Sequence, residues 1–172
     1  MKHTRKLVLA ALFLAIALVL PFITMQIPMI GQMLTPMHFP IILGSIFIGP
    51  IWGLAIGFIA PLLRLLLFGM PQMPTAIMMA FELAIYGLLT GLVINLFKNI
   101  KISFVLKVIV ALVIAIILGR ITFALTAMVF LQSTDFISVF IGTFTTSFIG
   151  IFLQLILIPL IALRLKKYVQ ND

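Results

Sequence analysis

Long apolar segments, several of them close to the length of a membrane-spanning helix, dominate this chain of 172 residues and decide what it can fold into. Hydrophobic side chains make up 65% of the residues and charged ones only 8%, with a mean hydropathy of +1.41. A water-soluble domain of this length could not bury so much apolar surface, so a lipid bilayer is the solvent for most of the chain. The sequence therefore predicts an all-α integral membrane protein.

Six apolar segments can be drawn along the chain, and we expect them to form one membrane domain over residues 1–172. They lie near residues 7–23, 39–50, 51–68, 74–97, 104–131 and 136–165. The second is short for a span that needs about 20 residues, and Gly49-Pro50 separates it from the third, so these two are interpreted as a tight hairpin. The sixth is long, and Pro159 is expected to bend it.

Glycines recur at a spacing of four residues at the start of the third segment and in the fourth. They are Gly49, Gly53, Gly57, Gly87 and Gly91. This spacing is typical of helices whose backbones approach closely in a membrane.

Nine of the eleven basic residues gather in three groups, which indicate the orientation of the chain. They are Lys2, Arg5, Lys6, Lys98, Lys101, Lys107, Arg164, Lys166 and Lys167. With six spans, all three groups fall on one side of the membrane, while the connections at 24–38, 69–73 and 132–135 contain no Lys or Arg. The positive-inside rule makes that side cytoplasmic, so both termini are predicted to be cytoplasmic. This placement accounts for the net charge of +8 without a nucleic-acid partner.

The basic stretch before the first segment resembles a signal peptide. No small-x-small cleavage site follows the apolar run, so we expect a retained first helix, with cleavage as the alternative.

Three charged side chains lie inside the predicted spans, all in the outer half of the membrane. At 1.5 Å per residue, Glu82 lies about 12 Å, Arg120 about 16 Å and Arg64 about 6 Å below the outer ends of their segments. Tyr86 shares the helix face of Glu82, one turn deeper. A lone carboxylate at such a depth costs about 2.5–3.5 kcal/mol of insertion free energy, so an ionisable group there indicates a function.

Polar residues of other segments complete a candidate site. Thr143, Thr146, Ser147, Gly150 and Gln154 form a small or polar stripe on the sixth segment, while His38 and Gln72 lie near the outer loops. The predicted substrate-binding residues are His38, Arg64, Gln72, Glu82, Tyr86, Arg120, Thr143 and Ser147. Structural roles stay open for several of them: a buried Glu82–Arg120 pair, an Arg64 that reaches the outer interface, a stripe that only packs, and a His38 that caps a helix. Together they predict a cavity that takes a small polar ligand from outside.

The composition argues against most catalytic functions. The chain has no cysteine, two histidines and three acids, and it lacks HExxH and GxxxxGK[ST] motifs, so we predict no catalytic residue, metal site, cofactor or ATPase activity. A self-sufficient secondary transporter of a small polar solute remains an alternative. No inverted repeat supports it, and Glu82 is the one acid placed deep enough to relay protons.

Three motifs within residues 35–92, about a third of the chain, carry a resemblance to a known family. They are Pro-Met-His-x-Pro at 36–40, Ala-Pro-Leu-Leu-Arg at 60–64 and Met-Ala-x-Glu-Leu-Ala-x-Tyr-Gly at 79–87. This region resembles the substrate-binding S components of energy-coupling-factor (ECF) vitamin transporters. The six segments, the small size and the basic termini fit that family as well.

The resemblance implies a function and partners. S components bind a vitamin or its precursor with high affinity near the outer face of the bacterial cytoplasmic membrane, and then dock on a transmembrane coupling subunit that carries two ABC-type ATPases. Within the family the segment is most similar to members assigned to hydroxymethylpyrimidine or pyridoxine, with pantothenate or another vitamin as the alternative. The family's first-helix AxxxA motif, which contacts the coupling subunit, matches Ala11 and Ala15, although ordinary packing within the chain is also open for them. The loop over residues 24–37 corresponds to the family's gate.

Overall fold

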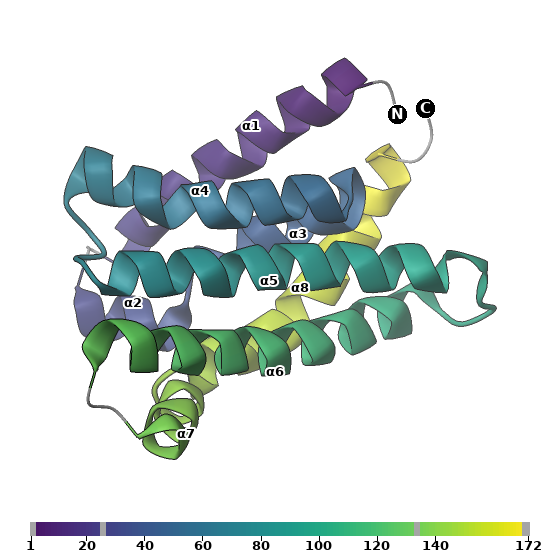
Figure 1. Cartoon of the computed structure of the whole chain (residues 1–172). Coiled ribbons are helices and arrows are strands. Elements are labelled where there is room, and N and C mark those ends of the chain that lie inside the picture. The colour runs from purple at the N-terminus through teal and green to yellow at the C-terminus, as the bar shows by residue number, and fades with distance from the viewer. Residues whose placement is uncertain (1–2, 25–26, 133–134, 170–172) are drawn as a thin grey trace.

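The computed structural model describes residues 3–24, 27–132 and 135–169, and every regular element within these ranges is a helix (Figure 1). The elements are α1 (His3–Val19), η1 (Leu20–Thr24), α2 (Pro28–Leu34), α3 (His38–Ile48), α4 (Pro50–Phe68), α5 (Thr75–Leu96), η2 (Phe97–Asn99), α6 (Phe104–Leu131), α7 (Phe136–Thr146) and α8 (Phe148–Val169). Six helical stretches of the described residues are long and apolar enough to cross a membrane: His3–Ile23, Met29–Ile48, Pro50–Phe68, Thr75–Asn99, Phe104–Leu131 and Phe148–Lys167. The predicted all-α membrane fold with six spans is confirmed.

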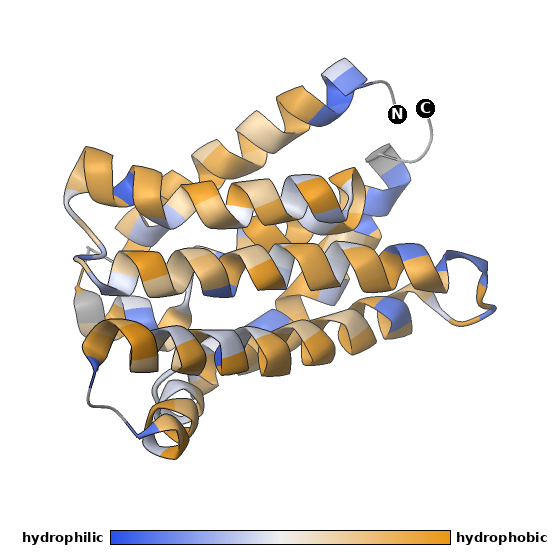
Figure 2. Cartoon of the chain, in the orientation of Figure 1, coloured by the Kyte–Doolittle hydropathy of each residue, from blue (hydrophilic) through white to orange (hydrophobic). Residues whose placement is uncertain are grey.

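The ends of the bundle differ in composition. The start of α1, the end of α8 and the η2 connection lie at one end of the bundle, whereas α2 and the last turns of α4 and α6 lie at the other (Figure 1). Hydrophilic residues gather at the end that holds the start of α1, the end of α8 and η2 (Figure 2). The described members of the three basic groups therefore share one end, as the sequence predicts, while Lys2 lies outside the described residues. We call the opposite end the distal end.

The second and third predicted segments form the expected hairpin. Gly49 links α3 to α4 with a positive φ of 99°, and Pro50 occupies the first turn of α4, where its missing N–H leaves no hydrogen bond unmade. The connection predicted over residues 24–38 is not a plain loop, because it contains the short helix α2.

The single helix predicted over 136–165 is wrong, because α7 and α8 are separate helices that meet at Ser147 (Figure 1). Hydroxyl groups explain the break. Thr143 donates a hydrogen bond to the Phe140 carbonyl, Thr146 donates to the Gly142 carbonyl, and Ser147 donates to the Thr143 carbonyl. Side chains that bond carbonyls of the preceding turn compete with the helical ladder and bend or end it. Pro159 lies inside α8 and does not end it.

Glycines bring α4 and α5 together as the most extensive helix pair of the described structure. A Cβ atom added at Gly53 would meet the carbonyl of Gly87, and one added at Gly57 would meet the carbonyl of Leu83. The neighbouring helix α3 joins this contact, because Ser45 donates a hydrogen bond of 2.6 Å to the Gly87 carbonyl. The four-residue glycine spacing thus marks a backbone-to-backbone contact, as in other membrane helix pairs.

We expect Gly87→Ala to destabilise the protein by about 1–3 kcal/mol or more, because the new methyl group overlaps the Gly53 backbone, which cannot rotate away. Thermal melting of the purified protein in detergent measures the change. The matched control is Gly142→Ala in α7, where a Cβ meets nothing within 4 Å, so its melting temperature should stay the same or rise slightly. Equal melting of the two variants would contradict the close approach of α4 and α5.

Candidate functional site

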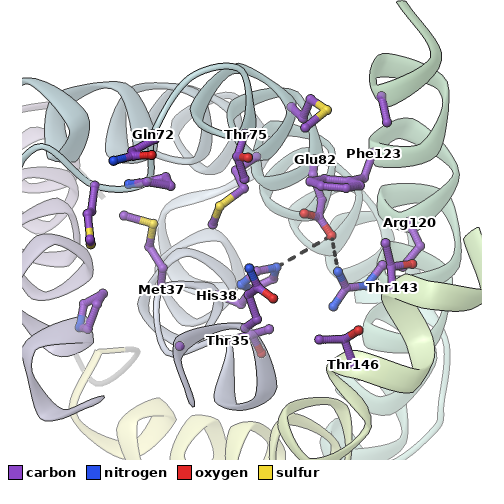
Figure 3. Close-up of a pocket in the computed structure, with 18 of the residues that line it drawn as sticks. Thr35, Met37, His38, Gln72, Thr75, Glu82, Arg120, Phe123, Thr143 and Thr146 are labelled. Atoms are coloured by element: carbon purple, nitrogen blue, oxygen red, sulfur yellow. Dashed lines mark ion pairs between the residues drawn. The ribbon is translucent and has the colours of Figure 1, made fainter. Parts of the chain in front are cut away.

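A cavity of about 670 Å³ lies at the distal end of the bundle, between α2, the end of α4 and the end of α6. The residues that line it come from η1, α2, the turn before α3 and the start of α3, the end of α4 and the connection that follows it, the first half of α5, the second half of α6, and α7 (Figure 3). Its volume falls in the range of about 300–1,000 Å³ that is typical of small-molecule sites. The described structure thus has room for a small ligand where the sequence predicts a site.

Three ionisable side chains from three helices meet in this cavity. Glu82 Oε1 of α5 lies 2.9 Å from Arg120 Nη1 of α6 and 3.8 Å from His38 Nε2, the first residue of α3. Only 1%, 5% and 2% of these three residues, respectively, is exposed. Figure 3 shows the carboxylate between the other two side chains. We call Glu82, Arg120 and His38 the charged cluster.

Small residues allow α5 and α6 to approach closely enough for this pair. A Cβ atom at Gly119 would overlap the ring of Tyr86, so the glycine leaves the space that the ring fills next to Arg120. Tyr86 in turn packs edge-on against His38, with ring centroids 4.9 Å apart and planes at 88°. The aromatic ring therefore supports the histidine from below and fixes its orientation.

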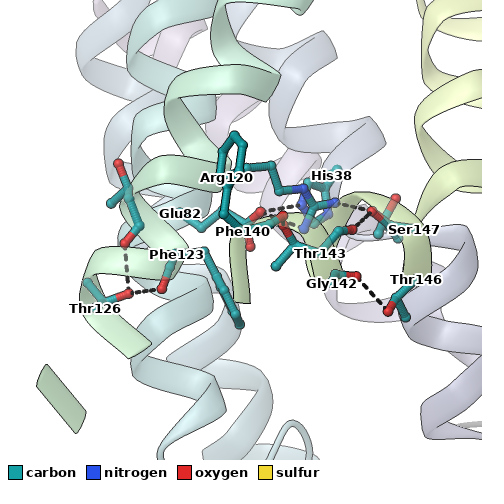
Figure 4. A network of polar contacts seen from close by, with 12 residues as sticks. His38, Glu82, Arg120, Phe123, Thr126, Phe140, Gly142, Thr143, Thr146 and Ser147 are labelled. Carbon is teal, nitrogen blue, oxygen red and sulfur yellow. Dashed lines mark hydrogen bonds and ion pairs between the residues drawn. The ribbon is translucent and has the colours of Figure 1, made fainter. Parts of the chain in front are cut away.

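The charged cluster extends to the break between α7 and α8. Arg120 Nη2 donates a hydrogen bond of 2.6 Å to Ser147 Oγ, and Ser147 donates to the Thr143 carbonyl, also at 2.6 Å (Figure 4). One guanidinium thus holds a carboxylate of α5 and a hydroxyl at the end of α7. Charge-assisted hydrogen bonds of this kind are the strong ones.

Several nitrogen atoms of the charged cluster make no hydrogen bond to the described protein groups. Both ring nitrogens of His38 and Nε of Arg120 are buried without a hydrogen-bond partner among the described residues. Most buried polar groups in proteins have such a partner. Because His38 lines the cavity, its nitrogens are available to a ligand there.

A second cation lines the cavity nearer the end of α4. Arg64 Nη1 donates a hydrogen bond of 2.5 Å to the carbonyl of Leu18, in the last turn of α1. Its guanidinium lies over the rings of Phe22 and Phe68, at 5.0 and 5.5 Å from their centroids. Arg64 is 4% exposed, so it does not reach out to the membrane surface as the simpler interpretation of the sequence would have it.

The turn before α3 is fixed to α8 by a buried polar contact. Gln154 Nε2 donates a hydrogen bond of 2.8 Å to Thr35 Oγ1, and Gln154 is fully buried. Thr35 has a φ of 45°, and Gly150 leaves the space that its side chain occupies. This contact holds Thr35, three residues before His38, in the cavity wall.

Six of the eight predicted substrate-binding residues line the cavity: His38, Arg64, Gln72, Glu82, Arg120 and Thr143. The other two do not. Tyr86 packs beneath His38, and Ser147 holds Arg120, so both support residues that line the cavity. That any of the eight binds a ligand stays a prediction.

Sequence reasoning missed the apolar walls of the cavity. Met37, Met78, Met79 and Phe123 line it, and Thr35 and Thr75 add hydroxyl groups. Met78 and Met79 precede Glu82 by four and three residues, and Phe123 follows Arg120 by three, so helical spacing from the charges could have found them. Methionine and phenylalanine suit an aromatic ring, whereas the charged cluster suits its polar substituents.

The predicted contact residues Ala11 and Ala15 are exposed on α1. The opposite face of that helix buries Ala10, Phe13 and Ala17 against the bundle. Ala11 and Ala15 are therefore not packed inside the described bundle, and the surface that they share is open to another helix. Their contact with a coupling subunit stays a prediction.

Comparison with known proteins identifies the class of the chain. A family model described as "ECF transporter, substrate-specific component" matches residues 5–162. Searches of curated proteins and of solved structures found no match.

The ion pair makes a prediction about stability. Glu82→Gln should destabilise the ligand-free protein by up to about 3–5 kcal/mol, because it leaves the buried Arg120 without its counter-charge. The double variant Glu82→Gln, Arg120→Gln should be more stable than the sum of the two single changes, because no lone charge remains. Thermal melting of the four proteins measures the coupling, with Asp135→Asn as the control for an exposed acid at the start of α7. Additive effects would contradict the pair.

Proposed function

This chain belongs to the substrate-specific components of ECF transporters, and from that premise we propose that it is the high-affinity binding subunit for uptake of a water-soluble vitamin or vitamin precursor. The observation that carries the proposal is the distal cavity, in which a buried charged cluster faces walls of methionine and phenylalanine. A binding subunit needs such a site, because buried charges give orientation and apolar walls give contact area.

The chemistry of the cavity supports a compact ligand with several polar substituents. The Glu82 carboxylate accepts hydrogen bonds from ligand N–H or O–H groups, Arg120 donates, and His38 does either. A heteroaromatic ring that carries hydroxymethyl or amino groups fits this set, as hydroxymethylpyrimidine and pyridoxine do. The motifs at residues 36–40 and 79–87 favour these two compounds, and pantothenate or another vitamin is the alternative.

Energy for uptake must come from partner subunits in this proposal. The sequence holds no nucleotide-binding motif, so a transmembrane coupling subunit with two ABC-type ATPases would supply it. The exposed face of α1 around Ala11 and Ala15 offers a smooth contact for that coupling subunit. We place the protein in a bacterial cytoplasmic membrane with the basic end in the cytoplasm, so that the cavity opens toward the outside and α2 lies in its gate.

A ligand of the proposed class should co-purify with the protein or bind to it in solution. Native mass spectrometry identifies a co-purifying molecule, and calorimetry measures binding of hydroxymethylpyrimidine, pyridoxine and pantothenate. Glu82→Gln, measured well below its melting temperature, should weaken binding by about tenfold or more, the scale of a charged hydrogen bond. The control is Asp135→Asn, since Asp135 does not line the cavity. Unchanged affinity in Glu82→Gln would remove Glu82 from the binding site.

If the protein docks on the coupling subunit through α1, a change on the exposed face of α1 should block transport and leave ligand binding intact. Ala15→Trp should abolish ATP-dependent uptake into proteoliposomes that also contain the coupling subunit and its ATPases, because the indole blocks close helix approach. Ligand binding should stay within about threefold of the original. Leu125→Trp, on an exposed side of α6, is the matched control and should transport normally.

Two results would contradict this arrangement. Intact uptake by Ala15→Trp would show that another surface docks. Accumulation of ligand by the chain alone, driven by a proton or sodium gradient, would favour a self-sufficient secondary transporter.

A further inference from the structure

Arg64 brings a positive charge to the cavity that no acid of the described residues balances. The whole chain has three acids. Glu82 pairs with Arg120, and Asp135 is exposed, bonds Ser138 and does not line the cavity. The third, Asp172, lies outside the described residues. With a neutral His38, the charged side chains that line the cavity, Arg64, Arg120 and Glu82, sum to one positive charge.

The groups that hold Arg64 do not remove this excess. The Leu18 carbonyl accepts from one guanidinium nitrogen, and the rings of Phe22 and Phe68 contribute cation–π attraction. The end of α1 contributes only the partial negative charge of a helix terminus, about half a unit. A guanidinium has five N–H donors, and in the described structure the hydrogen bond of Arg64 is made by Nη1. The N–H groups of Nε and Nη2 are left to bind a ligand. The side chain is thus fixed in place, buried, and still able to bind an acceptor in the cavity.

We propose that the ligand carries one negative charge, as a carboxylate, and that Arg64 binds it while the charged cluster binds the ligand's neutral polar groups. This proposal rests on the proposed function and deepens it by naming the class of substrate. A buried charge is costly unless it is paired, and a monoanion neutralises the cavity's excess. Arginine suits a carboxylate because its planar fork can donate two parallel hydrogen bonds. A phosphate monoester, with about 1.5 to 2 negative charges at pH 7, would overshoot the excess.

The charge balance changes the order of the candidate ligands. Hydroxymethylpyrimidine and pyridoxine carry hydroxymethyl groups and no carboxylate, whereas pantothenate has a carboxylate. The motifs favour the two ring compounds, but the balance of charge in the cavity favours a monocarboxylate. The motifs carry the likeness to other proteins, whereas the charge balance follows from the side chains that line this cavity, so we take the charge balance as the more direct criterion.

Matched pairs of probes test the proposal, because each pair differs only in its acidic group. The pairs are pantothenate and panthenol, 4-pyridoxate and pyridoxine, and nicotinate and nicotinamide. Calorimetry at pH 7 should show, for the pair that binds, that the acid binds about tenfold or more tightly than its neutral partner. Arg64→Gln should reduce this preference below about threefold, and Arg64→Lys, which keeps the charge, should retain part of it. Arg164→Gln, an exposed arginine in α8, is the matched control and should keep the full preference.

Other results would overturn either the carboxylate proposal or the proposed binding function. Equal or tighter binding of the neutral partner by the unmodified protein overturns the carboxylate proposal, and this measurement stands even if Arg64→Gln fails to fold without its bond to Leu18. Full acid preference in a folded Arg64→Gln also overturns it, as does a neutral or phosphorylated molecule found by native mass spectrometry. These results leave the proposed binding function intact. If no molecule co-purifies and neither hydroxymethylpyrimidine nor any probe of the three pairs binds, the proposed function itself fails.

Discussion

The ion pair between Glu82 and Arg120 is the contact on which the distal half of the protein depends. In a bilayer, either charge alone would be costly, and at 2.9 Å each lowers the cost of burying the other. The pair requires α5 and α6 to lie close together, which Gly119 permits by admitting the Tyr86 ring. Arg120 then reaches Ser147, so the same pair also fixes where α7 ends and α8 begins.

The close backbone packing of α4 and α5 extends to the basic end of the bundle, whereas the cavity lies at the distal end. Near the basic end, glycines place α4 and α5 backbone to backbone, and Gly91 lies against Pro50 at the start of α4. At the distal end the walls of the cavity include α7, which contributes no buried residue, and the seven-residue helix α2. Elements with few buried contacts open most easily, so a ligand can enter without disturbing the tightly packed helices.

The sequence predicted the spans and most charged members of the site, because lipid imposes simple rules on both. Apolar runs must be long enough to cross, and charges within them must find partners. Other features depend on tertiary contacts. Met78, Met79 and Phe123 look like lipid-facing residues until their neighbours are known, and Tyr86 leaves the cavity wall only because Gly119 makes room for its ring. The break at Ser147 likewise depends on hydroxyl bonding near Arg120, which hydropathy does not register.

Arg64 also connects the cavity with the surface proposed to dock on the coupling subunit. The guanidinium that lines the cavity bonds Leu18 and lies over Phe22, so it holds the distal end of the helix that exposes Ala11 and Ala15. A carboxylate drawn to this guanidinium would compete with the Leu18 carbonyl for its N–H donors or would tighten the whole contact. In either case, binding of such a ligand would change the interaction that fixes the end of α1. A ligand can bias docking only if it interacts differently with the two positions of that helix, and Arg64 is the residue through which it would do so.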